Sequence, residues 1–370
     1  MKMKNVFYLL VATLLLTACG NRQKDSKTGK EIAGAGATFP LPYYNIIFKD
    51  FGEKSGNKVT YGGIGSGGGI RSLMDKTVDF GASDAYLSDE ELKAAPAEIV
   101  HIPTCMGAVV LAYNLPGVKD LKLTGAVISG IYLGTITKWN DAAIKALNPD
   151  LTLPDKSVTP VYRSDGSGTT FVFSDYMTKV SPEWAEKMGT GKALKWPVGI
   201  AAKGNPGVAG IIQQTEGAVG YIGSEYGFAL SIPVAKLQNA AGNFVGPDTE
   251  SISAAANIEL PADMRAMVTN SSEAGAYPIS CFTWILVYKN QAYGKRTEDD
   301  SKALISLLDY VLSPEAQSVA ANGKLNYNLL NNRFCKEEKL SPNFTIFARK
   351  KGTFRFHLYA SITYGNTTSV

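Results

Sequence analysis

The chain alternates short apolar segments with turns rich in glycine and hydroxyl residues, and helical patterns follow these turns. Three units of strand, turn and helix are predicted: after residues 32–37, after residues 58–61 and at residues 163–170. A further strand is predicted at 78–82. Alternating strands and helices are typical of an open, mainly parallel sheet. The sequence therefore predicts an α/β fold.

The clearest of these turns is residues 163–170, Arg-Ser-Asp-Gly-Ser-Gly-Thr-Thr. Apolar side chains then recur at helical spacing over 173–180, so Ser167 and the residues after it lie at a helix start. There the backbone N–H groups lack intrahelical partners and the helix dipole is positive. Glycine allows close approach of an anion, and the guanidinium group of Arg163 can add a positive charge and two parallel hydrogen bonds. The turn predicts an oxyanion site, although taken alone it would be read as a plain capping turn.

Polar side chains also follow the other predicted strands. Thr38 lies two positions before Pro40 and is expected to cap the next helix, Ser66 lies in a glycine-rich turn, and Asp84 follows the strand at 78–82. In open α/β sheets, ligands bind at the carboxyl ends of strands, where helix N-termini point. We therefore expect Thr38, Ser66, Asp84 and Ser167 to face one pocket.

An aspartate in such a pocket would repel an anion that carries no proton. Phosphate keeps at least one proton at neutral pH, and Asp84 could accept a hydrogen bond from its P–OH group. Sulfate would meet only repulsion, and rejection of this kind discriminates more strongly than attraction. The alternative is a solvated loop aspartate. Asp165 is expected to hold the Arg163 guanidinium in place.

Other functions were weighed against this one. Residues 63–68 match the dinucleotide pattern Gly-x-Gly-x-x-Gly, with Asp84 about twenty positions further on. The following helix is short, however, and the turn at Ser167 has no place in that scheme. Neither turn ends in the Gly-Lys-Ser/Thr of a P-loop. The nucleotide reading is thus the weaker alternative.

The chain contains few of the residues that catalysis commonly requires. A serine nucleophile needs a positioned base, and the sequence contains no motif for one and two histidines in total. Beyond Cys19, the cysteines are Cys105, Cys281 and Cys335, with no Cys-x-x-Cys pair or His/Cys cluster. We expect no enzyme activity, no cofactor and no metal, with a secreted phosphatase as an alternative.

The N-terminus is predicted to be a targeting segment. Lys2 and Lys4 precede an apolar run over 6–16 that is too short for a permanent membrane span. Residues 16–19, Leu-Thr-Ala-Cys, resemble the bacterial lipobox. That resemblance implies a lipoprotein signal peptide at 1–18, lipidation of Cys19 and a flexible tether over 19–31. It implies export and a periplasmic or cell-surface location, and an ordinary signal peptide is the alternative.

The net charge of +4 does not indicate a nucleic-acid partner. Residues 331–370 hold seven Lys or Arg and two Glu, a charge of +5, which leaves −1 for everything before them. The basic character therefore belongs to the tail and not to a binding surface, so no nucleic acid is expected.

Four blocks resemble, in order, the phosphate-binding proteins of bacterial ABC-type phosphate transporters. They are residues 34–40 (Gly-Ala-Gly-Ala-Thr-Phe-Pro), 63–66 (Gly-Ile-Gly-Ser), 78–84 (Val-Asp-Phe-Gly-Ala-Ser-Asp) and 163–169 (Arg-Ser-Asp-Gly-Ser-Gly-Thr). The match runs from about Ile32 to about Gly323. The phosphate ligands that this resemblance implies are Thr38, Phe39 through its backbone N–H, Ser66, Asp84, Arg163, Ser167, Gly168 and Thr169.

The same resemblance implies a two-lobed periplasmic binding protein of type II, each lobe a mainly parallel sheet flanked by helices. Two hinge strands would join the lobes. The protein would close on inorganic phosphate with high affinity and deliver it, as a monomer, to the transmembrane subunits of an ABC permease. A relative tuned to another protonated oxyanion, such as arsenate, is the nearest alternative.

Lobe 1 is expected to combine residues 32–104 with 282–328, and lobe 2 to span 105–281. The hinge strands would then carry Cys105 and Cys281, which fit either a disulfide formed after export or two buried thiols. Residues 329–370 do not resemble the C-terminal segment of that family. Both an added hairpin and a frameshift product fit this tail.

Overall fold

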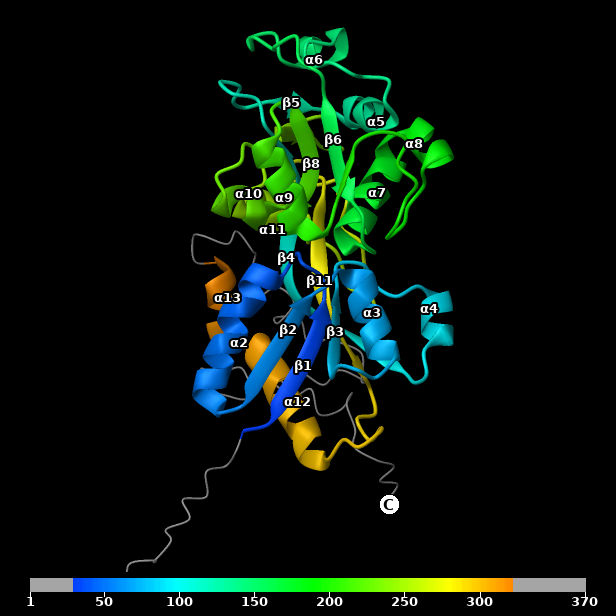
Figure 1. Cartoon of the computed structure of the whole chain (residues 1–370), viewed down its shortest axis with the longest axis vertical. Helices are drawn as coiled ribbons and strands as arrows, with labels where there is room; N and C mark the ends of the chain where they lie inside the picture. The colour runs from blue at the N-terminus through cyan, green and yellow to red at the C-terminus, as the bar shows by residue number, and fades with distance from the viewer. Residues whose placement is uncertain (1–28, 322–370) are drawn as a thin grey trace, which may run out of the picture.

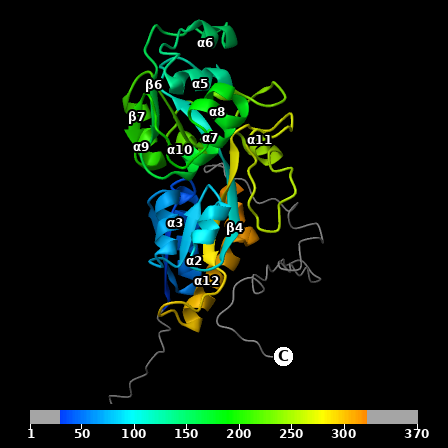
Figure 2. The ribbon, with the colours of Figure 1, turned by 90° about the vertical axis from the view of Figure 1, so that its right-hand side faces the viewer.

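A computed structural model describes residues 29–321 of the chain. The predicted signal peptide, Cys19, Cys335 and the tail at 329–370 lie outside the described residues. Figure 1 shows an elongated molecule in two parts, one blue and orange and the other green, which we call lobe 1 and lobe 2. The same two parts lie one above the other after a 90° turn (Figure 2).

One eight-stranded sheet runs through both lobes, in the order β2-β1-β3-β11-β4-β8-β6-β7. In lobe 1, β1 pairs parallel with β2 and β3, and in lobe 2, β6 pairs parallel with β7 and β8. The two central strands, β4 and β11, are antiparallel to each other and to their neighbours. The expected mainly parallel halves are therefore present, joined into one sheet by antiparallel hinge strands.

Within residues 29–321, lobe 1 contains three parallel strands and five helices. Its elements are β1 (Glu31–Gly36), α2 (Leu41–Ser55), β2 (Lys58–Gly63), α3 (Ser66–Met74), β3 (Phe80–Ser83), α4 (Asp89–Ala94), α12 (Glu298–Val311) and α13 (Pro314–Ala321). The side chains of Tyr44, Phe48, Tyr61 and Phe80 stack between α2 and the sheet and form an aromatic core.

Lobe 2 lies between the two hinge strands in sequence. Its elements are β5 (Lys122–Leu123), α5 (Gly125–Leu133), α6 (Ala142–Leu147), β6 (Thr159–Arg163), α7 (Gly168–Val180), α8 (Pro182–Lys187), β7 (Ile200–Ala202), α9 (Gly204–Gln214), β8 (Ala218–Gly223), α10 (Ser224–Ala229), β9 (Lys236–Gln238), β10 (Phe244–Val245) and α11 (Thr249–Ala254). Phe173 of α7 stacks on Tyr221 of β8 with ring centroids 4.4 Å apart, so the helix that carries the predicted oxyanion turn is packed firmly on the sheet.

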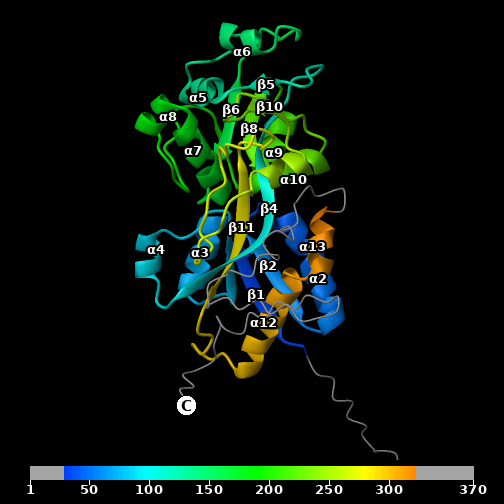
Figure 3. The same cartoon turned by 180° about the vertical axis from the view of Figure 1, so that it is seen from behind.

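The hinge strands are β4 (Ile99–Tyr113) and β11 (Ser280–Tyr288), which run side by side from one lobe to the other (Figure 3). β4 pairs with β11 from Ile99 to Ala108 and then with β8 from Val109 onwards. Every residue of β11 is buried. Continuous burial on both faces is what a central strand requires, and it accounts for the mostly apolar sequence of β11.

The two hinge cysteines are free thiols, so the disulfide is not formed. Cys105 pairs in register with Thr283, and Cys281 pairs with Gly107, which makes the cysteines diagonal neighbours. Diagonal Cα atoms lie about 7–8 Å apart, beyond the usual span of a disulfide. Burial raises the pKa of both thiols, which keeps them protonated and unreactive.

The first strand starts at the last residue of the predicted tether. Glu31 is the first residue of β1, and the ammonium group of Lys30 lies 2.9 Å from the carboxylate of Asp300 in α12. The parallel pairing of β1 with β2 starts at Glu31, opposite Lys58, so the strand extends beyond its apolar residues. Among the residues that the structure describes, no helix combines the length and apolar composition needed to cross a membrane.

Candidate functional site

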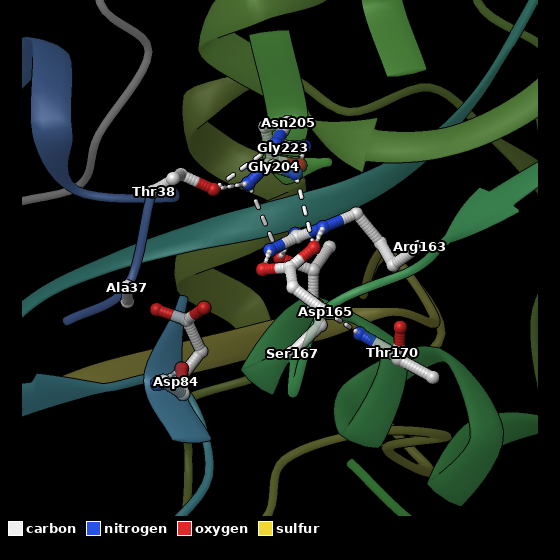
Figure 4. Close-up of polar contacts among 12 residues, drawn as sticks. Ala37, Thr38, Asp84, Arg163, Asp165, Ser167, Thr170, Gly204, Asn205 and Gly223 are labelled. Atoms are coloured by element: carbon white, nitrogen blue, oxygen red, sulfur yellow. Dashed lines mark hydrogen bonds and ion pairs between the residues drawn. The ribbon is translucent and has the colours of Figure 1, made fainter. Parts of the chain in front are cut away.

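The predicted binding residues meet where the two lobes touch. Figure 4 shows Thr38 and Asp84 of lobe 1 facing Arg163 and Asn205 of lobe 2. The six predicted side chains that carry polar groups are each at most 4% exposed: Thr38, Ser66, Asp84, Arg163, Ser167 and Thr169. Their elements converge because β1, β3 and β6 all end at this junction.

The lobe 2 side of the site is the start of α7. Ser167 occupies the N-cap position, and its hydroxyl oxygen accepts a hydrogen bond from the backbone N–H of Thr170 at 3.0 Å. The backbone N–H of Ser167 donates to the carbonyl of Lys192 at 2.8 Å. The predicted helix start is present, and the turn is held both by its cap and by a contact with Lys192.

Arg163 stands at the end of β6 and is held by Asp165. Its Nε and Nη2 donate to the two carboxylate oxygens of Asp165 at 2.8 and 2.6 Å, a bidentate pair. Burial would raise the pKa of Asp165, but the hydrogen bonds and charge of Arg163 outweigh it and the pKa is lowered. The remaining guanidinium nitrogen, Nη1, donates to the hydroxyl of Thr169 at 3.3 Å.

On the lobe 1 side, Ser66 begins α3 and Asp84 follows β3. The hydroxyl of Ser66 accepts a hydrogen bond from the backbone N–H of Asp84 at 3.3 Å. The hydroxyl of Thr283, on the hinge strand β11, donates to Oδ1 of Asp84 at 2.7 Å. These contacts tie two of the strand ends to the hinge.

Asp84 is a fully buried carboxyl group with a perturbed acidity. Burial raises its pKa to about 7, against the opposing effects of the Thr283 hydrogen bond, the Arg163 charge and a hydrogen bond from Thr169. A carboxyl group that titrates near neutrality can either accept or donate a hydrogen bond there. Perturbation of this kind, in a cluster of hydrogen-bond donors, is typical of a functional site.

Thr38 does not cap the helix that follows it, which corrects the sequence prediction. Pro40 occupies the N-cap position of α2, and no side chain caps that helix. The hydroxyl of Thr38 instead accepts hydrogen bonds from the backbone N–H and the side-chain amide of Asn205, each at 3.0 Å. The next residue, Phe39, is fully buried. A tertiary contact from the other lobe replaces the expected local one.

A third helix N-terminus, which was not predicted from the sequence, lies at this junction. α9 begins at Gly204, whose N–H donates to Asp165 at 3.0 Å, and Asn205 follows it, fully buried. Residues 203–207, Lys-Gly-Asn-Pro-Gly, come directly after the short strand β7 and carry the same signal as the other turns. The signal was weak because β7 is only three residues long and two of them, Ile200 and Ala201, are exposed, so no buried apolar run marks the strand.

The two lobes are closed on each other. The backbone N–H of Gly67 donates to the carbonyl of Gly166 at 2.8 Å, and the hydroxyl of Tyr226 donates to the carbonyl of Thr38 at 2.5 Å. A Cβ on Gly65, which has φ of +85°, would lie 2.3 Å from the carboxylate of Asp165. Only glycine fits this backbone angle and this approach.

Charged side chains also join the lobes beside α4. The ammonium group of Lys192 lies 2.7 Å from Oε2 of Glu91, and Nη1 of Arg265 lies 2.8 Å from the carboxylate of Asp89. Arg265 also donates to the carbonyl of Leu87 at 2.9 Å. Contacts on several sides of the junction shield the buried site from solvent.

The site as a whole offers many donors and one central acceptor. The N-termini of α3, α7 and α9 supply positive dipole ends, Arg163 supplies a fixed charge, and Asp165 is neutralised by that arginine. Asp84 is the acceptor among them. Within the described part of the chain, His, Cys, Asp and Glu form no group of three that could hold a metal ion. Such a site can bind a small oxyanion that carries a proton.

A family model and individual sequence relatives indicate the same family for this chain. Residues 21–315 match the PBP superfamily domain. Phosphate-binding protein PstS of Xylella fastidiosa (strain Temecula1 / ATCC 700964) is 44% identical over 264 residues, which cover 70% of this chain and 72% of that protein. Phosphate-binding protein PstS of Haemophilus influenzae is 39% identical over 320 residues, which cover 85% and 90% of the two chains.

A solved structure shares the fold. The crystal structure of an ABC-type phosphate transport receptor from Vibrio cholerae matches with a TM-score of 0.52 and 19% identity, over 80% of this chain and 99% of its own. The fold therefore agrees with the two-lobed architecture described above. From its sequence relatives, the chain belongs to the PstS family of phosphate-binding proteins, within the PBP superfamily.

Proposed function

We propose that this protein binds inorganic phosphate between its lobes and delivers it to an ABC-type import permease, without chemical change to the ligand. The relatives named above are phosphate-binding proteins, and the Vibrio cholerae neighbour is a phosphate transport receptor. The observation that carries the proposal is the buried Asp84 carboxyl group, placed among three helix N-termini and Arg163.

We propose that the ligands are the eight residues that the sequence resemblance implied. Hydroxyl groups of Thr38, Ser66, Ser167 and Thr169, and backbone N–H groups of Phe39 and Gly168, would donate to phosphate oxygens. Arg163 would add charge, oriented by Asp165. Asp84 would accept the hydrogen bond of the P–OH group. Closure of the lobes strengthens each of these contacts because water is excluded.

Isothermal titration with phosphate, arsenate and sulfate at pH 8 tests this function. Phosphate is expected to bind and sulfate to be excluded, since sulfate offers no hydrogen to the Asp84 carboxylate. Stronger binding of arsenate than of phosphate would reassign the ligand, and absence of anion binding would refute the proposal. Turnover of a chromogenic phosphate ester would refute the absence of catalysis.

The proposed architecture divides the chain at the hinge. We propose residues 32–104 with 282–328 as lobe 1 and 105–281 as lobe 2. The change of β4 from pairing with β11 to pairing with β8, after Ala108, supports a hinge in this region. Opening about the hinge would be seen as a larger radius of gyration in small-angle scattering of the phosphate-free protein.

We propose that the exported protein is a monomer anchored through a lipid on Cys19. The lipobox-like residues before Cys19 support this. Replacement of Cys19 by serine should release the protein from the membrane fraction of an expressing bacterium, without loss of phosphate binding. Membrane association of the Cys19→Ser protein would contradict the anchor.

A further inference from the structure

We propose that Asn205 is a positioning residue that forces the hydroxyl groups of Thr38 and Thr169 to act as donors toward the bound anion. This inference rests on the proposed phosphate binding and adds a specificity-determining residue to it. Asn205 is fully buried and lies at the start of α9, between the two lobes (Figure 4).

The orientation of the Asn205 amide follows from its neighbours. Its Oδ1 accepts a hydrogen bond from the backbone N–H of Gly223 at 3.0 Å. That N–H can only donate, so the oxygen must face it and the nitrogen must face the other way. The two hydrogens of Nδ2 then point at the hydroxyl of Thr38, at 3.0 Å, and at the hydroxyl of Thr169, at 3.2 Å.

Each of these threonine oxygens already accepts two N–H groups. Thr38 accepts from the backbone and the side chain of Asn205, and Thr169 accepts from Asn205 and from Nη1 of Arg163. A hydroxyl oxygen has two lone pairs and one hydrogen. With both lone pairs occupied, each hydroxyl can interact with a further group only by donating its hydrogen.

The direction of these donors matches an anion site. Thr169 and Asp84 are both buried at the lobe junction, beside the start of α7, where the anion is proposed to bind. Serine and threonine hydroxyls otherwise rotate freely and could present a lone pair to the anion. Fixing them beforehand avoids that repulsion and the entropy cost of ordering the hydroxyls on binding.

Asn205 also makes donor orientation depend on closure. Thr38 belongs to lobe 1, whereas Asn205 and Thr169 belong to lobe 2. The hydrogen bonds from Asn205 to Thr38 join residues 167 positions apart in sequence and can exist only when the lobes meet. A single amide therefore sets one donor on each side of the anion in the closed state.

A double-mutant cycle tests this role. Asn205→Ala is expected to weaken phosphate binding about 10- to 100-fold in the unmodified protein, the range for loss of buried polar partners. In a protein that already carries Thr38→Val and Thr169→Val, the same change is expected to cost less than about threefold, because the hydroxyls it acts through are gone. Equal losses in both backgrounds would overturn the proposal.

An isosteric variant gives a second, independent readout. Asn205→Asp keeps the shape and suits a helix N-terminus, but its carboxylate accepts hydrogen bonds and draws both threonine hydrogens away from the anion. We expect weaker phosphate binding than in Asn205→Ala at pH 8, with partial recovery as the pH falls and the new carboxyl group gains an O–H donor. A pH profile of phosphate affinity parallel to that of the unmodified protein would overturn the proposal. This test stands even if Asn205→Ala does not fold.

Asn148→Ala serves as the matched control. Asn148 is a buried asparagine whose amide bonds the backbone at Lys122 and Ile144, at the far end of lobe 2. Its loss should lower the melting temperature and leave phosphate affinity within about twofold. Failure of the unmodified protein to bind phosphate would refute the proposed function. If the unmodified protein binds normally, but Asn205→Ala leaves the affinity unchanged or lowers it equally with and without the two threonine substitutions, only the role of Asn205 is refuted.

Discussion

Gly168 and Ser66 lie against each other across the lobe junction. A Cβ built on Gly168 would come 2.4 Å from the hydroxyl oxygen of Ser66 and 2.8 Å from the backbone nitrogen of Asp84. Real Cβ contacts are not this short, and the backbone of Asp84 cannot move aside without disturbing β3. Glycine at this position is therefore a condition of closure.

Gly168→Ala is expected to hold the lobes apart. Phosphate affinity should fall at least about 100-fold, because the closed state becomes strained by several kcal/mol. The melting temperature of the phosphate-free protein should change little, since an open form relieves the clash. Gly210→Ala in α9 is the control, because a Cβ there meets nothing within 4 Å. Equal phosphate affinity of the two variants by calorimetry would contradict the argument.

Sulfate binding is expected to depend on pH through Asp84. Its pKa of about 7 means that the carboxyl group gains a proton as the pH falls below neutrality, and a protonated Asp84 can donate to sulfate. Sulfate affinity should therefore rise from pH 8 to pH 5. Asp84→Asn should bind sulfate at all these pH values, because its amide always offers a donor. A flat sulfate profile for the unmodified protein would remove this role for Asp84.

The free energy of unfolding of the phosphate-free protein should also depend on pH through Asp84. Its folded pKa lies above the ordinary 3.8, so between about 3.8 and about 7 the folded state binds more protons than the unfolded state. Stability from this group is thus present at low pH and is lost as the pH rises through about 7. Each pKa unit corresponds to about 1.4 kcal/mol, so the effect amounts to a few kcal/mol.

A second buried group, His101, changes the pH dependence of stability in the opposite direction, so its contribution has to be separated from that of Asp84. Burial lowers the pKa of His101 to about 4, so its contribution to stability rises with pH between about 4 and about 6.5. The free energy of unfolding should therefore be measured by urea denaturation for both the unmodified protein and Asp84→Asn. Their difference isolates Asp84, and it should change most between about pH 4 and pH 7, where the folded and unfolded states differ in protonation of this group. A constant difference would show that Asp84 titrates normally.

The ion pair between Lys192 and Glu91 should help to hold the lobes closed. It is only partly exposed, with side-chain exposures of 18% and 34%. Lys192→Met removes the charge and leaves the backbone carbonyl that binds Ser167. Phosphate affinity is expected to fall about fivefold, mainly through faster release, since a pair of this kind is worth about 1 kcal/mol.

Lys187→Met is the matched control for that pair. Lys187 pairs with Glu183 inside lobe 2, where both side chains are about half exposed. Stopped-flow release of phosphate should be unchanged in this variant. If Lys192→Met releases phosphate at the same rate as the Lys187→Met control, the pair does not stabilise closure.

The local signals of this chain predicted its local structure well. The helix predicted after Ser167 begins at Gly168, and Ser167 caps it, because capping depends on residues three positions apart. The bidentate pair of Arg163 and Asp165 was also predicted, since the two residues are neighbours in one turn.

The errors and omissions concern contacts between distant residues. Thr38 was expected to cap its own helix, but a partner from the other lobe takes its oxygen. Asn205 was missed because nothing in residues 203–207 indicates which hydroxyl groups the amide will meet. From the sequence, the two hinge cysteines fitted either a disulfide or two buried thiols, and only the strand register distinguished these alternatives.

The order of strands and helices, the helix starts and the chemical character of the turns were therefore determined by the sequence itself, since short-range sterics and hydrogen bonding decide them. The tertiary structure alone decided that Gly168 touches Ser66, that Asn205 bridges the lobes and that burial raises the pKa of Asp84. These features depend on the packing of one lobe against the other, and no local rule of the chain encodes the distance between them.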